Sequence, residues 1–185
     1  QDIVLGPSKN SRWSYAASKL VDEFLGLAYC NQHDLPVIVV RLFNTVGPRQ
    51  VGHYGMVIPR FVEQAISGSK ITVYGDGKQT RCFCNVSDTI EALIGLIDND
   101  NCIGEVYNIG SSDEISIEQL ARLVKKITNS DSEIVFIPYE DAYSDGFEDM
   151  QRRVPDTEKI YSAIGWKSSI GIEETIRSVF EYIEK

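Results

Sequence analysis

"VIVVRLF", residues 37–43, decides the fold class, because six of its seven residues are apolar and three of them are valine. An apolar, β-branched run of this kind is typical of a strand that is buried on both faces, as in a parallel sheet. A helix is predicted just before it, over residues 13–33, with Ser14 as its N-cap and Pro36 beyond its end. The apolar residues that recur on one side of this helix are Leu20, Phe24, Leu25, Leu27 and Ala28.

The rest of the chain continues the alternation of strands and helices. A capping box is expected from Ser116 to Gln119, and Ser87 is expected to cap the helix that follows it. Strands are predicted at 70–74, 82–86, 105–110 and 133–138, and helices at 57–67, 88–99, 116–128, near 156–163 and at 171–184. This order predicts an α/β protein.

Composition limits the possible partners and cofactors. The 185 residues carry a net charge of −9, which argues against a nucleic-acid or anionic membrane surface, and no apolar run is long enough to cross a bilayer. Four cysteines and two histidines match no metal motif, so no metal is expected. We expect free thiols and a cytoplasmic location. The chain starts in a loop ahead of a helix, so we expect it to be the back part of a longer protein.

Tyr15 and Lys19, in "YAASK", are four residues apart in the predicted helix. Positions i and i+4 share a helix face, and an ammonium near a phenol lowers the phenol pKa, which suits general acid/base chemistry. The alternative is a surface lysine on an amphipathic helix. Tyr74 and Lys78 have the same spacing, but Gly75-Asp-Gly77 between them will not hold a helical turn.

Several ordered segments together resemble the extended short-chain dehydrogenase/reductase family, in its nucleotide-sugar epimerase, dehydratase and decarboxylase branch. The matching text is "YAASK" at 15–19, "RLFNTVGPR" at 41–49, "VYGDGKQTRCFCNVSD" at 73–88, "YNIGS" at 107–111, "RRVPD" at 152–156 and "IGW" at 164–166. The resemblance implies the back part of a doubly wound Rossmann-type parallel sheet plus a small mixed α/β substrate lobe. Residues 1–50 would belong to the NAD-binding domain, and residues 51–185 mainly to the lobe, with some segments returning to the sheet.

The resemblance also implies roles for individual residues. Tyr15 would be the catalytic acid/base, and Lys19 would hold the nicotinamide ribose of NAD. Phe43 would lie on the cofactor side. Arg81 and Arg153 would grip the diphosphate of a UDP- or dTDP-linked sugar, as a guanidinium fork can. The remaining substrate contacts would be Asn44, Val57, Val73, Tyr74 and Asp156.

Several of these residues could instead have a purely structural role. Asn44 could serve only as a turn former, and Arg81 could be a solvated surface residue. Arg152 and Arg153 could pair with the acidic loop before them, and only one of the two is expected to face substrate. Arg41 is expected to brace the edge of the sheet.

The activity that we favour from the sequence is an NAD-dependent nucleotide-sugar 4-epimerase of the UDP-glucose 4-epimerase kind, working through a transient 4-keto sugar. UDP-glucuronate decarboxylase and dTDP-glucose 4,6-dehydratase remain alternatives, as does a non-catalytic module for sugar-nucleotide binding or dimerisation. No Gly-x-Gly-x-x-Gly opens a helix after a strand here, and the family's Ser/Thr partner of Tyr15 is also missing. We therefore expect this chain alone to be inactive. The family resemblance also implies a homodimer through the Tyr15 helix.

Overall fold

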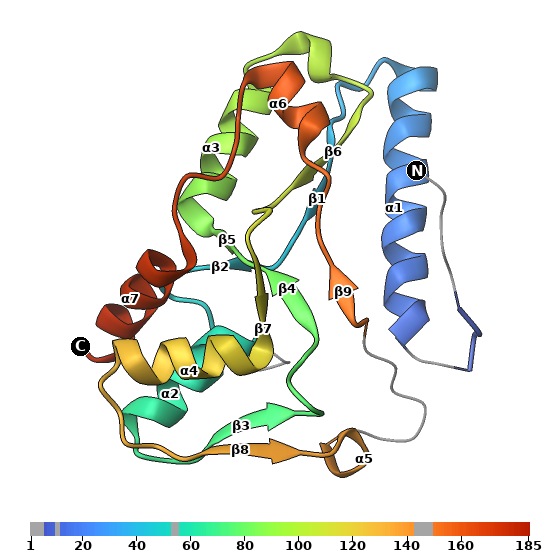
Figure 1. Cartoon of the computed structure of the whole chain (residues 1–185). Helices are drawn as coiled ribbons and strands as arrows, with labels where there is room; N and C mark the ends of the chain where they lie inside the picture. Colours follow the sequence, from blue (N-terminus) through green and yellow to red (C-terminus); the bar gives the residue numbers. More distant parts are fainter. Residues whose placement is uncertain (1–5, 10–11, 53–55, 143–149) are drawn as a thin grey trace.

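The protein is described by a computed structural model at residues 6–9, 12–52, 56–142 and 150–185 (Figure 1). The helices are α1 (Arg12–His33), α2 (Val57–Ile66), α3 (Val86–Ile97), η1 (Asp100–Cys102), α4 (Ile117–Ile127), α5 (Tyr139–Ala142), α6 (Glu158–Ile164) and α7 (Ile172–Ile183). The strands are β1 (Val39–Leu42), β2 (Thr45–Val46), β3 (Ile71–Tyr74), β4 (Thr80–Cys82), β5 (Cys84–Asn85), β6 (Val106–Ile109), β7 (Glu114–Ser116), β8 (Ile134–Ile137) and β9 (Arg152–Arg153). The α/β class is confirmed.

The upper part of the molecule in Figure 1 has three layers around the parallel pair β1–β6. Helix α1 packs on one face, where a Cβ on Gly26 would lie 3.3 Å from Val37. On the other face α3 and α6 enclose an apolar cluster. Its buried members are Cys84, Ala92, Leu96, Cys102, Tyr107, Ile109, Ile160 and Trp166. Helices on both faces of a parallel sheet are the Rossmann-type arrangement that the sequence predicted.

Strand β1 is less buried than its apolar sequence predicted. Val39, Val40 and Arg41 are only half-buried, and Leu42 is 46% exposed. Within the described residues β1 is hydrogen-bonded to β6 alone, so one of its edges has no neighbouring strand. The expected full burial was therefore wrong for this chain by itself: helices lie on both faces, but the open edge leaves the strand partly accessible.

A second core lies in the lower part of the molecule in Figure 1, where α2, α4 and α7 pack together beside the parallel pair β3–β8. Phe61, Ile71, Leu120 and Ile176 are fully buried there. A three-stranded sheet, in the order β7-β4-β9, is antiparallel on the β7 side and parallel on the β9 side. The predicted domain boundary at residue 50 stays a prediction, and β6 from the second part pairs with β1 from the first.

Helix caps divide into confirmed and wrong predictions. The capping box of Ser116 and Gln119 is present. Ser87 does not cap α3; Asn85 does, because its side-chain oxygen accepts from the Ser87 amide at 2.9 Å. The predicted strand over 82–86 is accordingly divided, with β5 ending at Asn85 and the helix starting at Val86. Ser14 is not an N-cap either, because α1 already begins at Arg12 and a cap must stand outside the helix.

The cysteines Cys30, Cys82, Cys84 and Cys102 are all free, as predicted. Within the described ranges no group of three or more His, Cys, Asp and Glu side chains is placed to hold a metal ion. Among the same residues, no helix combines the length and the apolar character needed to cross a membrane.

Candidate active site

Tyr15 and Lys19 lie on one face of α1 and are both open to solvent. The Lys19 Nζ is 5.9 Å from the centroid of the Tyr15 ring, and Tyr15 is 71% exposed. A buried ring, or side chains directed apart, would have ended the case for Tyr15 as an acid/base assisted by Lys19. The pair is therefore accessible to a ligand, and its catalytic role remains a prediction.

Lys19 has a second neighbour that the sequence pattern did not single out. Its ammonium donates to the Asp22 Oδ2 at 2.8 Å, one turn further along α1. The hydrogen bond that Lys19 donates to Asp22, together with the negative charge of this carboxylate, raises the pKa of Lys19. Lys19 is thus held as a cation beside the Tyr15 ring.

An ion pair attaches α1 to the sheet. Arg41 on β1 donates from Nε and Nη2 to the two carboxylate oxygens of Glu23, at 2.7 and 2.6 Å. The hydrogen bonding of Arg41 to the Glu23 carboxylate raises the pKa of Arg41. This agrees with the expectation that Arg41 braces the sheet, and it fixes the helix that carries Tyr15 relative to β1.

Asn44, two residues after β1, forms hydrogen bonds with backbone groups of neighbouring segments. It takes a φ of +42°, and its Nδ2 donates to the Cys82 carbonyl at 2.7 Å. Its own carbonyl accepts from the Cys84 amide at 3.2 Å. These hydrogen bonds explain why an asparagine stands here: it is a turn residue that joins the loop after β1 to β4 and β5. Contact between Asn44 and the substrate stays a prediction.

Arg81 and Arg153 are brought together by strand pairing. They are register partners in the parallel pair β4–β9, so their side chains leave the sheet on the same face. The Arg153 Cζ lies 5.1 Å from the centroid of the Phe43 ring, which links the predicted cofactor and substrate residues. The Arg81 Nη1 donates to the Thr80 carbonyl at 2.7 Å. The strand pairing thus places two arginine side chains on one face of neighbouring strands, and their contact with a diphosphate stays a prediction.

The neighbouring Arg152 has a different environment. Its Nε and Nη2 donate to the Glu114 carboxylate at 3.0 and 3.1 Å. Hydrogen bonds from Thr80 and Arg152 lower the pKa of Glu114. Arg152 is therefore an ion-pair residue on the opposite side of β9 from Arg153, since neighbouring side chains alternate along a strand.

Tyr74 ends β3 and is half-buried, whereas Val73 is fully enclosed in the lower core. Substrate contact by Val73 and Tyr74 stays a prediction. The Arg60 Cζ on α2 lies 4.3 Å from the centroid of the Tyr74 ring, a stacking that the sequence reasoning missed. Val57 opens α2 and packs partly against the same core. Tyr74 and Lys78 do not share a helix, as expected.

Asp156 has local partners. Its Oδ1 accepts from the Glu158 amide at 3.0 Å at the start of α6, and its carbonyl accepts from the Asn108 Nδ2 at 2.9 Å. These bonds join α6 to β6. The predicted role in orienting an arginine or a ribose stays a prediction.

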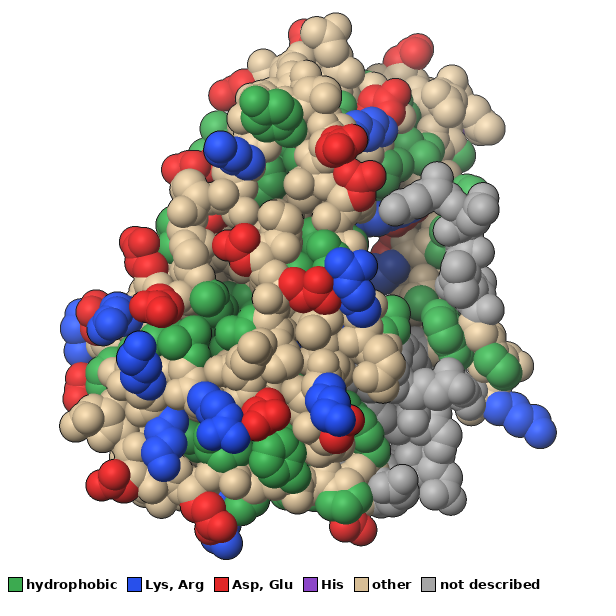
Figure 2. Space-filling view, viewed as in Figure 1, with side chains coloured by type: hydrophobic (Ala, Val, Ile, Leu, Met, Phe, Trp, Pro, Cys, Tyr) green, Lys and Arg blue, Asp and Glu red, His purple; other side chains and the backbone are tan. Residues whose placement is uncertain are grey.

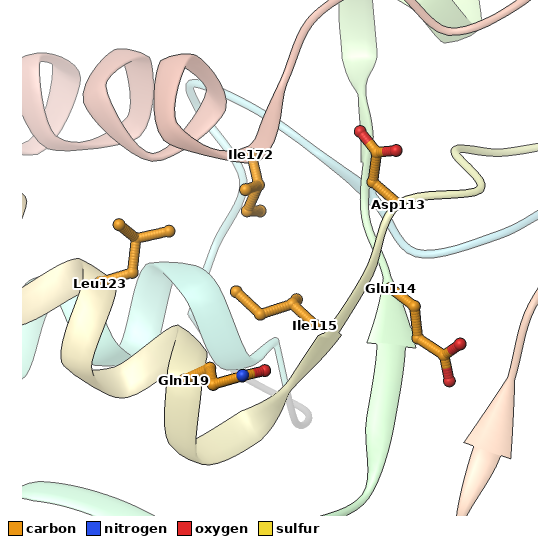
Figure 3. A pocket seen from close by; sticks show the side chains of 6 residues that line it. All are labelled: Asp113, Glu114, Ile115, Gln119, Leu123 and Ile172. Carbon is orange, nitrogen blue, oxygen red and sulfur yellow. The ribbon is translucent and has the colours of Figure 1, made fainter.

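The surface is hollowed between the part formed by α1 and the rest of the molecule, and Lys or Arg side chains are visible in this hollow (Figure 2). A separate pocket of about 360 Å³ lies elsewhere, between β7, α4 and α7 (Figure 3). Its lining residues are Asp113, Glu114, Ile115, Gln119, Leu123 and Ile172. None of these is a predicted site residue, and in Figure 3 the Glu114 carboxylate points away from the isoleucines and Leu123.

Known proteins include clear relatives of this chain. The chain matches the family model described as GDP-mannose 4,6 dehydratase over residues 7–179. It is 44% identical over 183 residues to UDP-N-acetyl-alpha-D-glucosaminuronate decarboxylase of Bacillus cytotoxicus, with 95% of this chain and 56% of that protein covered. It is 37% identical over 174 residues to UDP-glucuronic acid decarboxylase 1 of Xenopus tropicalis, with 94% and 39% covered.

A solved structure gives the same answer for the fold. The dTDP-glucose 4,6-dehydratase of Bacillus anthracis, in complex with NAD, superposes with a TM-score of 0.80 at 26% identity. The superposition covers 92% of this chain and 51% of that one. The chain thus spans about half the length of the first of the two relatives and of this structure, and less of the second relative. The match to the family model over most of the chain, together with the Rossmann-type layers, shows that the chain belongs to the extended short-chain dehydrogenase/reductase family, in its NAD-dependent nucleotide-sugar epimerase, dehydratase and decarboxylase branch.

Proposed function

We propose that the full-length protein decarboxylates a UDP-linked hexuronate. The observation that carries this choice is the 44% identity to a decarboxylase of a UDP-linked uronate, supported by the 37% identity to a second one. Both of these relatives are enzymes, and this supports a catalytic role for the exposed Tyr15 and Lys19.

The described residues fit such a substrate at two points. The in-register Arg81 and Arg153 offer two guanidinium forks to the diphosphate, and the exposed Tyr15 phenol is available to a sugar hydroxyl. The Arg41–Glu23 ion pair fixes the helix that carries Tyr15 to β1. Phe43 follows β1 directly, and its ring is in contact with the Arg153 guanidinium.

NAD is the cofactor that we propose, and it would supply hydride acceptance and return at the sugar C4. The exposed Tyr15 and Lys19 fit the nicotinamide ribose, because a phenol and an ammonium on one helix face are both hydrogen-bonding groups for hydroxyls. This chain has no glycine-rich phosphate loop, so the remainder of the cofactor site would come from outside these residues.

Tyr15 would remove the proton from the sugar 4-hydroxyl oxygen as the C4 hydrogen leaves as hydride, which gives a 4-keto sugar. In such a β-keto acid the bond from C5 to the carboxylate breaks, releasing carbon dioxide and leaving an enolate that takes up a proton at C5. Tyr15 then returns its proton to the C4 oxygen as hydride returns to C4. Lys19 would keep its positive charge beside the phenolate throughout, which stabilises the deprotonated state.

The 4-epimerase favoured from the sequence is the second candidate, because "YAASK" at 15–19 is closer to epimerase and dehydratase usage than the "YDEGK" of one decarboxylase group. The three activities differ in their products. A decarboxylase releases carbon dioxide, an epimerase gives an isomer of unchanged mass, and a dehydratase releases water.

The test uses the full-length protein, incubated with UDP-glucuronate, UDP-N-acetylglucosaminuronate, UDP-glucose and dTDP-glucose, with the products identified by mass spectrometry and NMR. We expect carbon dioxide release from a uronate, without net consumption of NAD. If UDP-glucose is converted to an isomer and neither uronate reacts, the protein is an epimerase and the proposed decarboxylation is wrong.

Replacing Tyr15 with Phe should abolish turnover and leave the Kd for the sugar nucleotide nearly unchanged, because only the phenolic oxygen is removed. Tyr161→Phe is the matched control, since Tyr161 is an exposed tyrosine on another helix, α6, and it should keep wild-type turnover. Binding of the sugar nucleotide without turnover by the wild-type protein would favour the non-catalytic module.

We also propose that the protein forms a homodimer through α1 and works in the cytoplasm, as the sequence suggested. Support for the dimer comes from apolar side chains that are more than half exposed on this helix: Val21, Phe24, Leu25 and Tyr29.

A further inference from the structure

Gln79 is a buried amide in the turn between β3 and β4, two residues before Arg81. It is only 5% exposed, although glutamine is normally a surface residue. Its Nε2 donates to the Tyr74 carbonyl at 3.0 Å and to the Tyr139 hydroxyl at 2.9 Å. Both hydrogens of one amide group are therefore used to join the end of β3 to the start of α5.

Tyr139 is fixed by a close approach of the backbone as well as by Gln79. A Cβ on Gly75 would lie 2.3 Å from the Tyr139 Cε2, so only glycine leaves room for the ring. Gly75 also takes a φ of +70°, which glycine adopts without strain. The ring and its hydroxyl are thus held by two independent contacts with the turn that follows Tyr74.

The backbone of the same turn holds the strand that carries Arg153. The Thr80 amide donates to the Gln151 carbonyl at 2.8 Å, next to the position where Arg81 and Arg153 are in register. The Gln79 carbonyl accepts from the Ile117 amide at 3.1 Å, which fixes Gln79 to the start of α4. Gln79 and Thr80 together therefore bind the chain at Tyr139, where it leaves β8, and at Gln151, where it enters β9.

We propose that Gln79 is a positioning residue for nucleotide-sugar binding, which holds Tyr74 and the paired Arg81 and Arg153 in place through Tyr139; this inference rests on the proposed function. Without the amide, the Tyr74 carbonyl and the Tyr139 hydroxyl each lose a partner. The groups that bind the nucleotide would then be less well ordered before the ligand arrives, so binding would weaken while proton transfer at Tyr15 would not change.

The test compares Gln79→Met, Tyr139→Phe and the double variant in the full-length protein. We expect each single variant to raise the KM for the sugar nucleotide, and the Kd for UDP measured by calorimetry, about tenfold, and to leave kcat within about twofold. The double variant should be no worse than Gln79→Met, because the two residues act through one hydrogen bond.

Gln64→Met is the matched control. Its amide also attaches to β3, with Nε2 donating to the Thr72 Oγ1 at 2.9 Å and Oε1 accepting from the Thr72 amide at 3.1 Å, but it does not reach Tyr139. This variant should lower the Tm and leave KM unchanged.

Wild-type KM and Kd in both Gln79→Met and Tyr139→Phe would overturn the inference and leave the proposed function standing. Should Gln79→Met fail to fold, Tyr139→Phe still decides, because it removes a single hydroxyl and keeps the ring against Gly75. A wild-type protein that neither binds UDP nor converts any sugar nucleotide would overturn the proposed function, and this inference with it.

Discussion

Cys82 and Cys30 have different surroundings, and this difference makes their reactivity predictable. Burial, reinforced by the charges of Glu114 and Asp113, raises the pKa of the Cys82 thiol to about 11, whereas Cys30 is partly exposed. At pH 8 we expect N-ethylmaleimide to modify Cys30 first and to reach Cys82 only after unfolding in urea. Peptide mapping by mass spectrometry measures the order, and equal rates for both thiols in the folded protein would contradict it.

The raised pKa of Cys82 also determines how this thiol affects the stability of the fold as the pH changes. The folded state holds the Cys82 proton more tightly than the unfolded chain, in which the ordinary pKa is near 9. The contribution of this thiol is therefore complete at neutral pH and is lost as the pH rises from about 9 through about 11.

Individual site residues were predictable from sequence to different degrees. The spacing of Tyr15 and Lys19 identified two side chains on one face of a helix, because helical periodicity is local. Alternation along β3 places the Val73 side chain in the core and that of Tyr74 on the other face, a difference that the family resemblance did not indicate. Gln79 was missed because its two partners, Tyr74 and Tyr139, come together only through tertiary contacts.

Helix α3 offers a direct test of its observed cap. Asn85→Ala removes the bond to the Ser87 amide and the bond from Nδ2 to the Thr175 Oγ1, so we expect a loss of about 1–2 kcal/mol in the free energy of unfolding. Ser87→Ala, at the exposed position that the sequence favoured, should change it by less than about 0.5 kcal/mol. Urea denaturation measures both, and the reverse order would restore Ser87 as the cap.

The contact between α1 and β1 can be tested through its ion pair. Arg41→Met leaves the Glu23 carboxylate, which is 19% exposed, without its bidentate partner, so we expect a loss of about 1.5–3 kcal/mol. Lys70→Met is the control, because Lys70 and Glu133 form a pair in which both side chains are 66% exposed, and it should change stability by less than about 1 kcal/mol. A similar small effect for both would show that α1 is held by packing alone.

Helices and strands were more predictable from the sequence than individual site residues. Every predicted helix is present, because amphipathic periodicity and turn residues are encoded locally. Helix starts at Arg12 and Val86 were misassigned because several Ser and Asn residues could each cap a first turn. The burial of β1 could not be predicted, since it depends on neighbours that periodicity does not specify.

At the scale of the whole molecule, the exposed apolar side chains of α1 predict self-association. Phe24→Glu places a charge among Val21, Leu25 and Tyr29, and we expect the full-length protein to shift from dimer to monomer in size-exclusion chromatography with light scattering. Ile97→Glu, an exposed apolar position on α3, is the control and should leave the dimer intact. A monomeric wild type, or a dimer in both variants, would exclude α1 as the interface.

The placement of the two tryptophans gives this chain two optical reporters. Trp13 lies against Gly6 at the start of the Tyr15 helix, and the Trp166 Nε1 donates to the Asp88 carbonyl inside the upper core. Fluorescence of a Trp166→Phe variant would follow events near Tyr15, and that of Trp13→Phe would follow melting around α3 and α6. Ligand binding and unfolding can thus be recorded separately, without any attached dye.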